Sequence, residues 1–234
     1  MLLSLGLQPM AQTTQPEFGD WTAVDLVQRF GAIPLHRIRH TPMPGTATER
    51  DVIEIREHED RLCELVDGVL VEKAMGSYEA YLGSLLTHLL WAFVRPRKLG
   101  VVLSADAMIR LAPGLIRIPD VSFFSWARLP GGKITGEAFY DAIGDLAVEI
   151  ISRSNTRKEM QQKLQEYFAG GARLVWYVYH QPRQEVRVYT SPQDYSVLAS
   201  DQVLEGGDVL PGFRLELREL FAEPQGPTPG AVRE

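Results

Sequence analysis

The run Leu146-Ala147-Val148-Glu149-Ile150-Ile151 constrains the fold more than any other segment of the chain. A short apolar run of this kind, without alternation, is typical of a central strand that is covered on both faces. A lone glutamate inside such a strand is costly to bury unless a cation, a metal or a proton compensates its charge. The chain therefore requires a sheet with cover on both sides, and Glu149 requires a partner.

Four helices are predicted from apolar residues at helical spacing. The third has Ser77 as its cap and is ended by Pro96, and the fourth begins after Ser154 or Asn155. The expected ranges are 21–30, 48–60, 78–95 and a last helix that runs to about Ala169.

Strands are predicted between these helices. Asp67-Gly68 separates two apolar runs, which is a strong hairpin signal. The order of helices and strands indicates an α/β (α+β) fold in which a mixed β-sheet is flanked by helices. The expected strands cover residues 62–66, 69–72, 100–104, 107–111, 116–124, 146–151, 174–179 and 185–189.

The length of 234 residues fits one sizeable domain with an arm or tails. We expect a flexible tail over 1–20, a helical N-terminal arm over 21–60, the main domain over 61–222 and a second flexible tail over 223–234. The single cysteine, Cys63, excludes an internal disulfide and favours a cytoplasmic location. The sequence has no apolar run of about 18 residues, so no membrane span is expected.

The net charge and the local distribution of charge point to different functions. The formal net charge of -6 argues against a general nucleic-acid binder. Residues 79–173, however, hold twelve Lys or Arg against nine Asp or Glu. A phosphate-binding cleft would produce this local excess, and so would chance.

Several common chemistries are excluded by their missing motifs. The sequence has no phosphate-binding loop of the Walker type, no dinucleotide-binding glycine pattern and no Gly-x-Ser-x-Gly elbow. The five histidines show no spacing that suits a zinc site.

Two acids stand out because their neighbours are apolar. Asp120 lies within residues 116–124, and Glu149 lies within 146–151. Two carboxylates that converge would form a site for a hard cation such as Mg²⁺. Taken singly, Asp120 could instead cap a turn at the end of a strand, and Glu149 could pair with a local arginine.

Glu79 and Lys163 are two further candidates on helices. Glu79 shares a face with Leu82 and Leu86, so it either points toward the sheet or interacts with the helix dipole. Lys163 follows Met160 by three residues, at the edge of the apolar stripe, where it either belongs to a site or extends along the helix toward solvent.

In this order, a helix glutamate, a strand Pro-Asp, a strand glutamate and a later lysine form a set that resembles the Uma-type restriction endonucleases, a branch of the PD-(D/E)XK nuclease superfamily. The resemblance covers about residues 60 to 222. Its matching stretches are 63–71, 118–121, 146–156, Lys163 with Tyr167, 174–178 and 210–213.

The resemblance implies a restriction-endonuclease-like core and Mg²⁺-dependent (or Mn²⁺-dependent) cleavage of DNA. Asp120, Glu149 and Glu79 would hold the metal, and Lys163 would complete the catalytic set. The superfamily pattern places a lysine two residues after the second acid, where this chain has Ile151. Lys163 on the following helix would take over that function.

Contacts with DNA phosphates are expected from four basic residues: Arg117, Arg153, Arg157 and Lys158. Many nucleases of this class pair to cut both strands, so a homodimer is also expected, with the 21–30 helix as a docking arm.

Two alternative functions remain open. One is a nuclease-fold module of weak or no activity that binds nucleic acid or protein, which the negative charge and Ile151 favour. The other is a glycosidase that uses the acid pair, although the carboxylates lack flanking aromatic residues.

Overall fold

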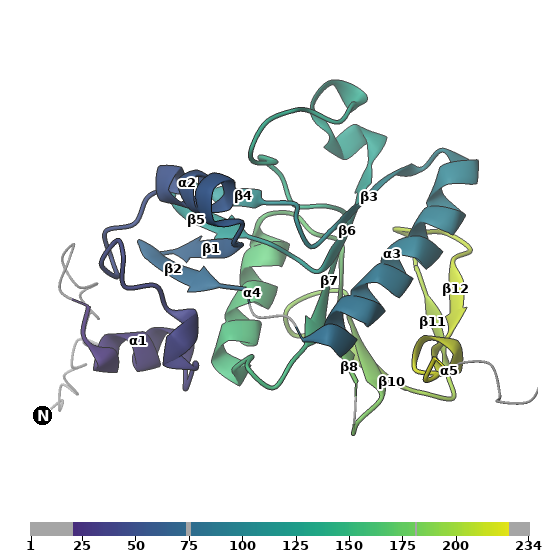
Figure 1. Cartoon of the computed structure of the whole chain (residues 1–234). Coiled ribbons are helices and arrows are strands. Elements are labelled where there is room, and N and C mark those ends of the chain that lie inside the picture. The colour runs from purple at the N-terminus through teal and green to yellow at the C-terminus, as the bar shows by residue number, and fades with distance from the viewer. Residues whose placement is uncertain (1–20, 74–75, 181, 225–234) are drawn as a thin grey trace, which may run out of the picture.

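The centre of the computed structural model is a six-stranded sheet with the order β10-β9-β8-β7-β6-β3 (Figure 1). The structure describes residues 21–73, 76–180 and 182–224, so the predicted tail 1–20 and most of the tail 223–234 lie outside it. β7 and β8 are parallel and the other neighbours are antiparallel, which confirms a mixed sheet. The strands are β3 (Gly100–Ser104), β6 (Val121–Ser125), β7 (Leu146–Ile151), β8 (Leu174–Tyr179), β9 (Glu185–Tyr189) and β10 (Tyr195–Ala199).

A second sheet has the order β2-β1-β5-β4, and its strands are β1 (Cys63–Val66), β2 (Val69–Glu72), β4 (Ile109–Ala112) and β5 (Leu115–Arg117). The predicted hairpin joins β1 to β2. Its turn needs Gly68, because φ is +70° there and a Cβ atom would lie 2.4 Å from the carbonyl oxygen of Gly45. A small third sheet pairs β11 (Val203–Glu205) with β12 (Arg214–Glu216) beside the short helix α5 (Leu217–Leu220).

The single strand predicted over 116–124 is wrong, because the chain passes between the two larger sheets at Ile118-Pro119-Asp120. Pro119 has no N–H to donate to a ladder. The N–H of Ile118 donates instead to the Glu64 carboxylate, at 3.1 Å. Asp120 consequently stands at the junction of the two sheets.

Helices α3 (Ser77–Arg97) and α4 (Arg157–Ala169) cover opposite faces of the six-stranded sheet (Figure 1). Val148 and Ile150 pack in the same core as Leu82 and Leu86 of α3. Ala147 packs in a separate core with residues of α4. Alternate residues of β7 thus face different helices, which confirms the prediction of a strand covered on both sides.

Three predicted helix boundaries are wrong. Pro96 does not end α3, because a proline in the last turn removes few helical hydrogen bonds; the helix continues to Arg97, and Lys98 ends it in the left-handed conformation. Its N-cap is Gly76 instead of Ser77. The cap of α4 is Thr156, which forms a reciprocal capping box with Glu159.

Residues 21–60 contain α1 (Ala23–Phe30), a short 3₁₀ turn (Leu35–Arg37) and α2 (Glu49–Glu59). α1 packs near the start of α4, where the Thr156 hydroxyl donates to the carbonyl oxygen of Phe30. Across the described ranges of the chain, no helix has the length and apolar character needed to cross a membrane.

We expect Cys63 to react very slowly with a thiol reagent in the folded protein. The side chain is 1% exposed, and burial raises the pKa of its thiol to about 12. At pH 8 this lowers the thiolate fraction on the order of a thousandfold relative to a free thiol, and the thiolate is the reactive form. Modification by Ellman's reagent, followed with and without denaturant, measures the difference. Equal rates in the two conditions would contradict the buried position of β1.

Candidate active site

Asp120 directly precedes β6, and Glu149 lies in the neighbouring strand β7. The N–H of Asp120 donates to the Val148 carbonyl at 2.9 Å, and β6 pairs with β7 through Val121 and Val148. Asp120 therefore lies directly before the paired part of β6, beside the segment of β7 that carries Glu149. Both are buried, and both line a cavity of about 20 Å³. The structure thus brings the predicted acid pair together.

Lys163 reaches this pair from α4. Its ammonium lies 3.1 Å from Glu149 Oε1 and 2.8 Å from Glu64 Oε1. The side chain is 3% exposed, so the alternative of a lysine that extends to solvent is wrong. The Tyr167 hydroxyl, one helical turn later, also donates to Glu149 Oε1.

The side chains that β7 directs toward α4 explain why the lysine of the site comes from this helix. Glu149 lies between Ala147 and Ile151 on the face that α4 covers, and Ile151 packs against the core of that helix. An aliphatic residue, Ile151, therefore fills the position two residues after the second acid. An ammonium from α4 approaches Glu149 on that same face.

Glu79 lines the same cavity from the first turn of α3, and its Oε1 lies 3.0 Å from His180 Nε2. No three Asp, Glu, His or Cys side chains are arranged to hold a metal within residues 21–73, 76–180 and 182–224. The structure therefore brings Glu79 to the cavity, and its function as a third metal ligand stays a prediction.

A buried ion-pair network extends from the site, and the sequence analysis missed Glu64 at its centre. Glu64 Oε2 accepts from Arg117 at 2.9 Å, and Arg117 also donates to Glu166 at 2.7 Å. Glu64 could have been found, because it is an acid in an apolar strand like Glu149. The expected phosphate contact of Arg117 is wrong, since this side chain is 2% exposed between its two acids. Arg153, Arg157 and Lys158 are exposed.

Lys73 and Arg37 were also missed. The Lys73 ammonium is 2.8 Å from Asp120 Oδ1 and donates to the carbonyl oxygen of Ile118. Arg37 forms a two-pronged ion pair with Glu159, at 2.8 and 3.1 Å. Neither basic residue belongs to a motif, and both meet partners that are distant in sequence.

Burial and charge act differently on the two central glutamates. Burial alone would raise the pKa of Glu64, but Lys163 and Arg117 outweigh it and lower that pKa to about 2. Burial raises the pKa of Glu149, against the effect of Lys163 and with a contribution from Asp120. Burial also disfavours the Lys163 ammonium, but Glu149 and Glu64 prevail and raise its pKa above the usual value. Of these two glutamates, Glu149 is thus the one whose charged form its neighbours stabilise less.

The site suits a small, hard divalent cation. Asp120 and Glu149 offer carboxylate oxygens, and Mg²⁺ is commonly held by one or two protein carboxylates together with waters and substrate phosphate. The cavity of about 20 Å³ has room for one water molecule or one small ion. Asp120 Oδ2 accepts from the N–H of Ile150 at 2.6 Å, which fixes the orientation of this carboxylate.

We predict that Lys163→Met lowers the free energy of unfolding by about 3–5 kcal/mol, because it leaves Glu64 and Glu149 buried without their shared cation. Urea unfolding followed by tryptophan fluorescence measures the loss. Lys158→Met, on the exposed part of the same helix, is the matched control and should change stability by less than about 0.5 kcal/mol. Equal unfolding midpoints for the two variants would refute the importance of the buried lysine.

Comparison with known proteins agrees with this architecture. Residues 50–218 match the family model described as "Uma2: Putative restriction endonuclease". The chain is also similar to the crystal structure of a "putative nuclease belonging to DUF820" from Anabaena variabilis ATCC 29413, with 19% identity, a TM-score of 0.62, and coverage of 69% of this chain and 90% of that chain. At this identity the similarity shows the fold alone. No curated protein matches. The family resemblance and the fold expected from the motifs are confirmed.

Proposed function

Because the chain belongs to the Uma2 restriction endonuclease family, we propose that it is a Mg²⁺- or Mn²⁺-dependent endonuclease that hydrolyses phosphodiester bonds of DNA. One observation carries the proposal. Asp120 and Glu149 line a single cavity, with the Lys163 ammonium at 3.1 Å from Glu149. Glu79 lines that cavity as well and is proposed to complete the catalytic set.

In the proposed mechanism, Asp120 and Glu149 would hold the divalent cation. Bound there, the cation would supply Lewis-acid chemistry: it would offset charge on the phosphate and lower the pKa of the attacking water. The Ile150 N–H aims the Asp120 carboxylate, and the Tyr167 hydroxyl aims that of Glu149. These fixed donors preorganise the acids, so little reorganisation is needed during the reaction.

Lys163 contributes positive charge and does not remove a proton. Its raised pKa keeps the ammonium protonated at neutral pH. Its positive charge compensates the negative charges of Glu64 and Glu149, so these two glutamates can remain buried before substrate arrives. The same charge would oppose the negative charge that develops on a phosphate under attack.

A binding module without cleavage activity is the second candidate. The net charge of -6 favours it, as does the burial of Arg117 between two acids, where it is not available to a phosphate. This module would bind nucleic acid or protein without cleaving it, and only the nuclease predicts cation-dependent cleavage of DNA.

We predict that plasmid or single-stranded DNA is cleaved with Mg²⁺ or Mn²⁺, and that Asp120→Ala reduces the rate at least about 100-fold by removing one of the proposed cation ligands. Gel assays with and without EDTA measure both effects. Asp141→Ala, an exposed acid in a loop, serves as the control and should retain the wild-type rate. Cleavage that persists in Asp120→Ala would remove Asp120 from the mechanism, and a wild-type protein that cuts neither DNA would favour the binding module.

A further inference from the structure

Lys73 lies between two hollows of the molecule. It lines the small cavity of the Asp120–Glu149 pair and also a larger hollow of about 470 Å³. Its side chain is 9% exposed, and its ammonium is held by Asp120 Oδ1 and by the Ile118 carbonyl oxygen. The mechanism proposed above gives this buried ammonium no function, although it contacts one of the two central acids.

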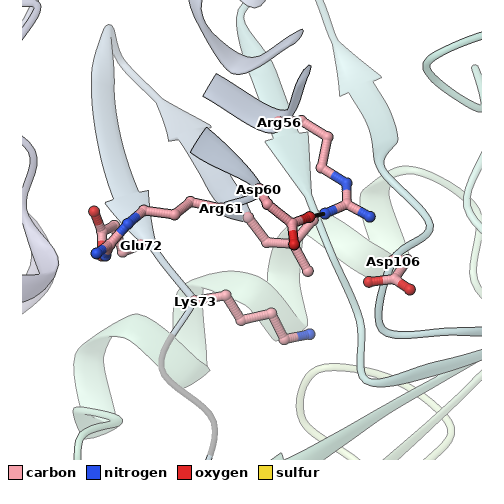
Figure 2. A pocket seen from close by; sticks show the side chains of 7 residues that line it. Arg56, Asp60, Arg61, Glu72, Lys73 and Asp106 are labelled. Carbon is pink, nitrogen blue, oxygen red and sulfur yellow. Dashed lines mark hydrogen bonds and ion pairs between the residues drawn. The ribbon is translucent and has the colours of Figure 1, made fainter. Parts of the chain in front are cut away.

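The larger hollow is polar, and its lining residues are Arg56, Asp60, Arg61, Leu62, Glu72, Lys73 and Asp106. In Figure 2, the guanidinium of Arg61 lies beside Glu72, whereas the Lys73 ammonium points to the other side, toward the part of the hollow where Arg56 and Asp106 lie. Lys73 can therefore reach both the acid pair and the hollow from one backbone position.

The other cations of the hollow are held weakly. Arg56 pairs with Asp60, whose side chain is 91% exposed, and Arg61 pairs with Glu72 while it is itself 58% exposed. Ion pairs in such solvated positions contribute little. A phosphate could therefore recruit Arg56 at small cost, and a guanidinium suits the geometry of phosphate oxygens.

At Asp120, Lys73 competes with any added cation. Asp120 Oδ2 is occupied by the Ile150 N–H, and Oδ1 is occupied by the Lys73 ammonium at 2.8 Å. A divalent cation that binds this carboxylate meets a like charge within contact distance, and such repulsion is strong in a buried site. The four-carbon stem of lysine is flexible enough to move the ammonium away.

We propose that Lys73 is an exchangeable counter-ion of Asp120. A divalent cation displaces its ammonium from the carboxylate, and the ammonium then turns into the larger hollow, where together with Arg56 it binds a backbone phosphate of the nucleic-acid strand. This inference rests on the proposed function, because it assumes that Asp120 binds the cation.

The first test is the affinity of the full chain for Mn²⁺ without DNA, measured from the electron paramagnetic resonance signal of free Mn²⁺. Lys73→Met should lower the Kd about tenfold, since a neighbouring cation changes the proton affinity of a carboxylate by at least that factor. Lys73→Arg keeps the charge and should retain the wild-type Kd. Arg61→Met is the matched control, because it lines the hollow without contacting Asp120.

The second test is binding of a short DNA duplex in EDTA and in Ca²⁺, with the DNA checked for cleavage on a denaturing gel. In EDTA, Lys73→Met should bind like the wild type, because the ammonium is held on Asp120. In Ca²⁺ it should bind more weakly, and the slope of log K against log salt should fall by about 0.9, the value for one lost phosphate contact. A purely structural function of Lys73 would not make the defect depend on the cation.

The outcomes separate the two proposals. A wild-type protein that binds no Mn²⁺ would overturn the proposed function and this inference with it. If the wild type binds Mn²⁺ and Lys73→Met binds it no more tightly, the exchange at Asp120 is wrong while the nuclease proposal stands. A DNA-binding defect of equal size in EDTA and Ca²⁺ would likewise overturn the exchange. A cooperative urea unfolding transition for each variant shows that it is folded.

Discussion

The burial of one ammonium between two carboxylates is the interaction on which the rest of the structure depends. Lys163 comes from α4, Glu64 from β1 of one sheet and Glu149 from β7 of the other. Removing the ammonium would leave two carboxylates in the interior without their shared cation, which is strongly destabilising. The two sheets and the helix therefore have to come together as a unit. The close approach of the acids proposed for catalysis is a consequence of that assembly.

The part of the site that lies on strands can be predicted from sequence, and the part that depends on contacts between sheets cannot. Asp120 and Glu149 each stand out as an acid among apolar residues, and pairing of their strands places them together. Glu64 could be recognised in the same way, as an acid among apolar residues. Lys73 carries no such signal, because its position follows from packing the end of β2 against residues 118–120, and no local pattern encodes a contact between the ends of two sheets.

The fold, too, is predictable from sequence where local patterns determine it and not where contacts between distant segments do. Periodicity located α3, α4, β7 and β8, since each has an apolar face or an apolar run that burial requires. The same periodicity wrongly joined β5 and β6 into one strand, because apolar residues continue through Ile118. The change of sheet depends instead on Glu64, whose carboxylate accepts a hydrogen bond from the backbone N–H of Ile118. Periodicity also missed β10, whose side chains are mostly exposed and give no alternating pattern.

The Arg37–Glu159 pair lies across the edge of the segment shared with the family, which begins at residue 50. Arg37 also donates to the carbonyl oxygens of Glu72 and Ser154, so one guanidinium ties β2 to the loop that leads into α4. A chain trimmed to the shared segment would keep every proposed catalytic residue but would leave Glu159 buried without its cation. The segment shared with the family is thus smaller than the segment within which the buried charge of Glu159 finds its partner.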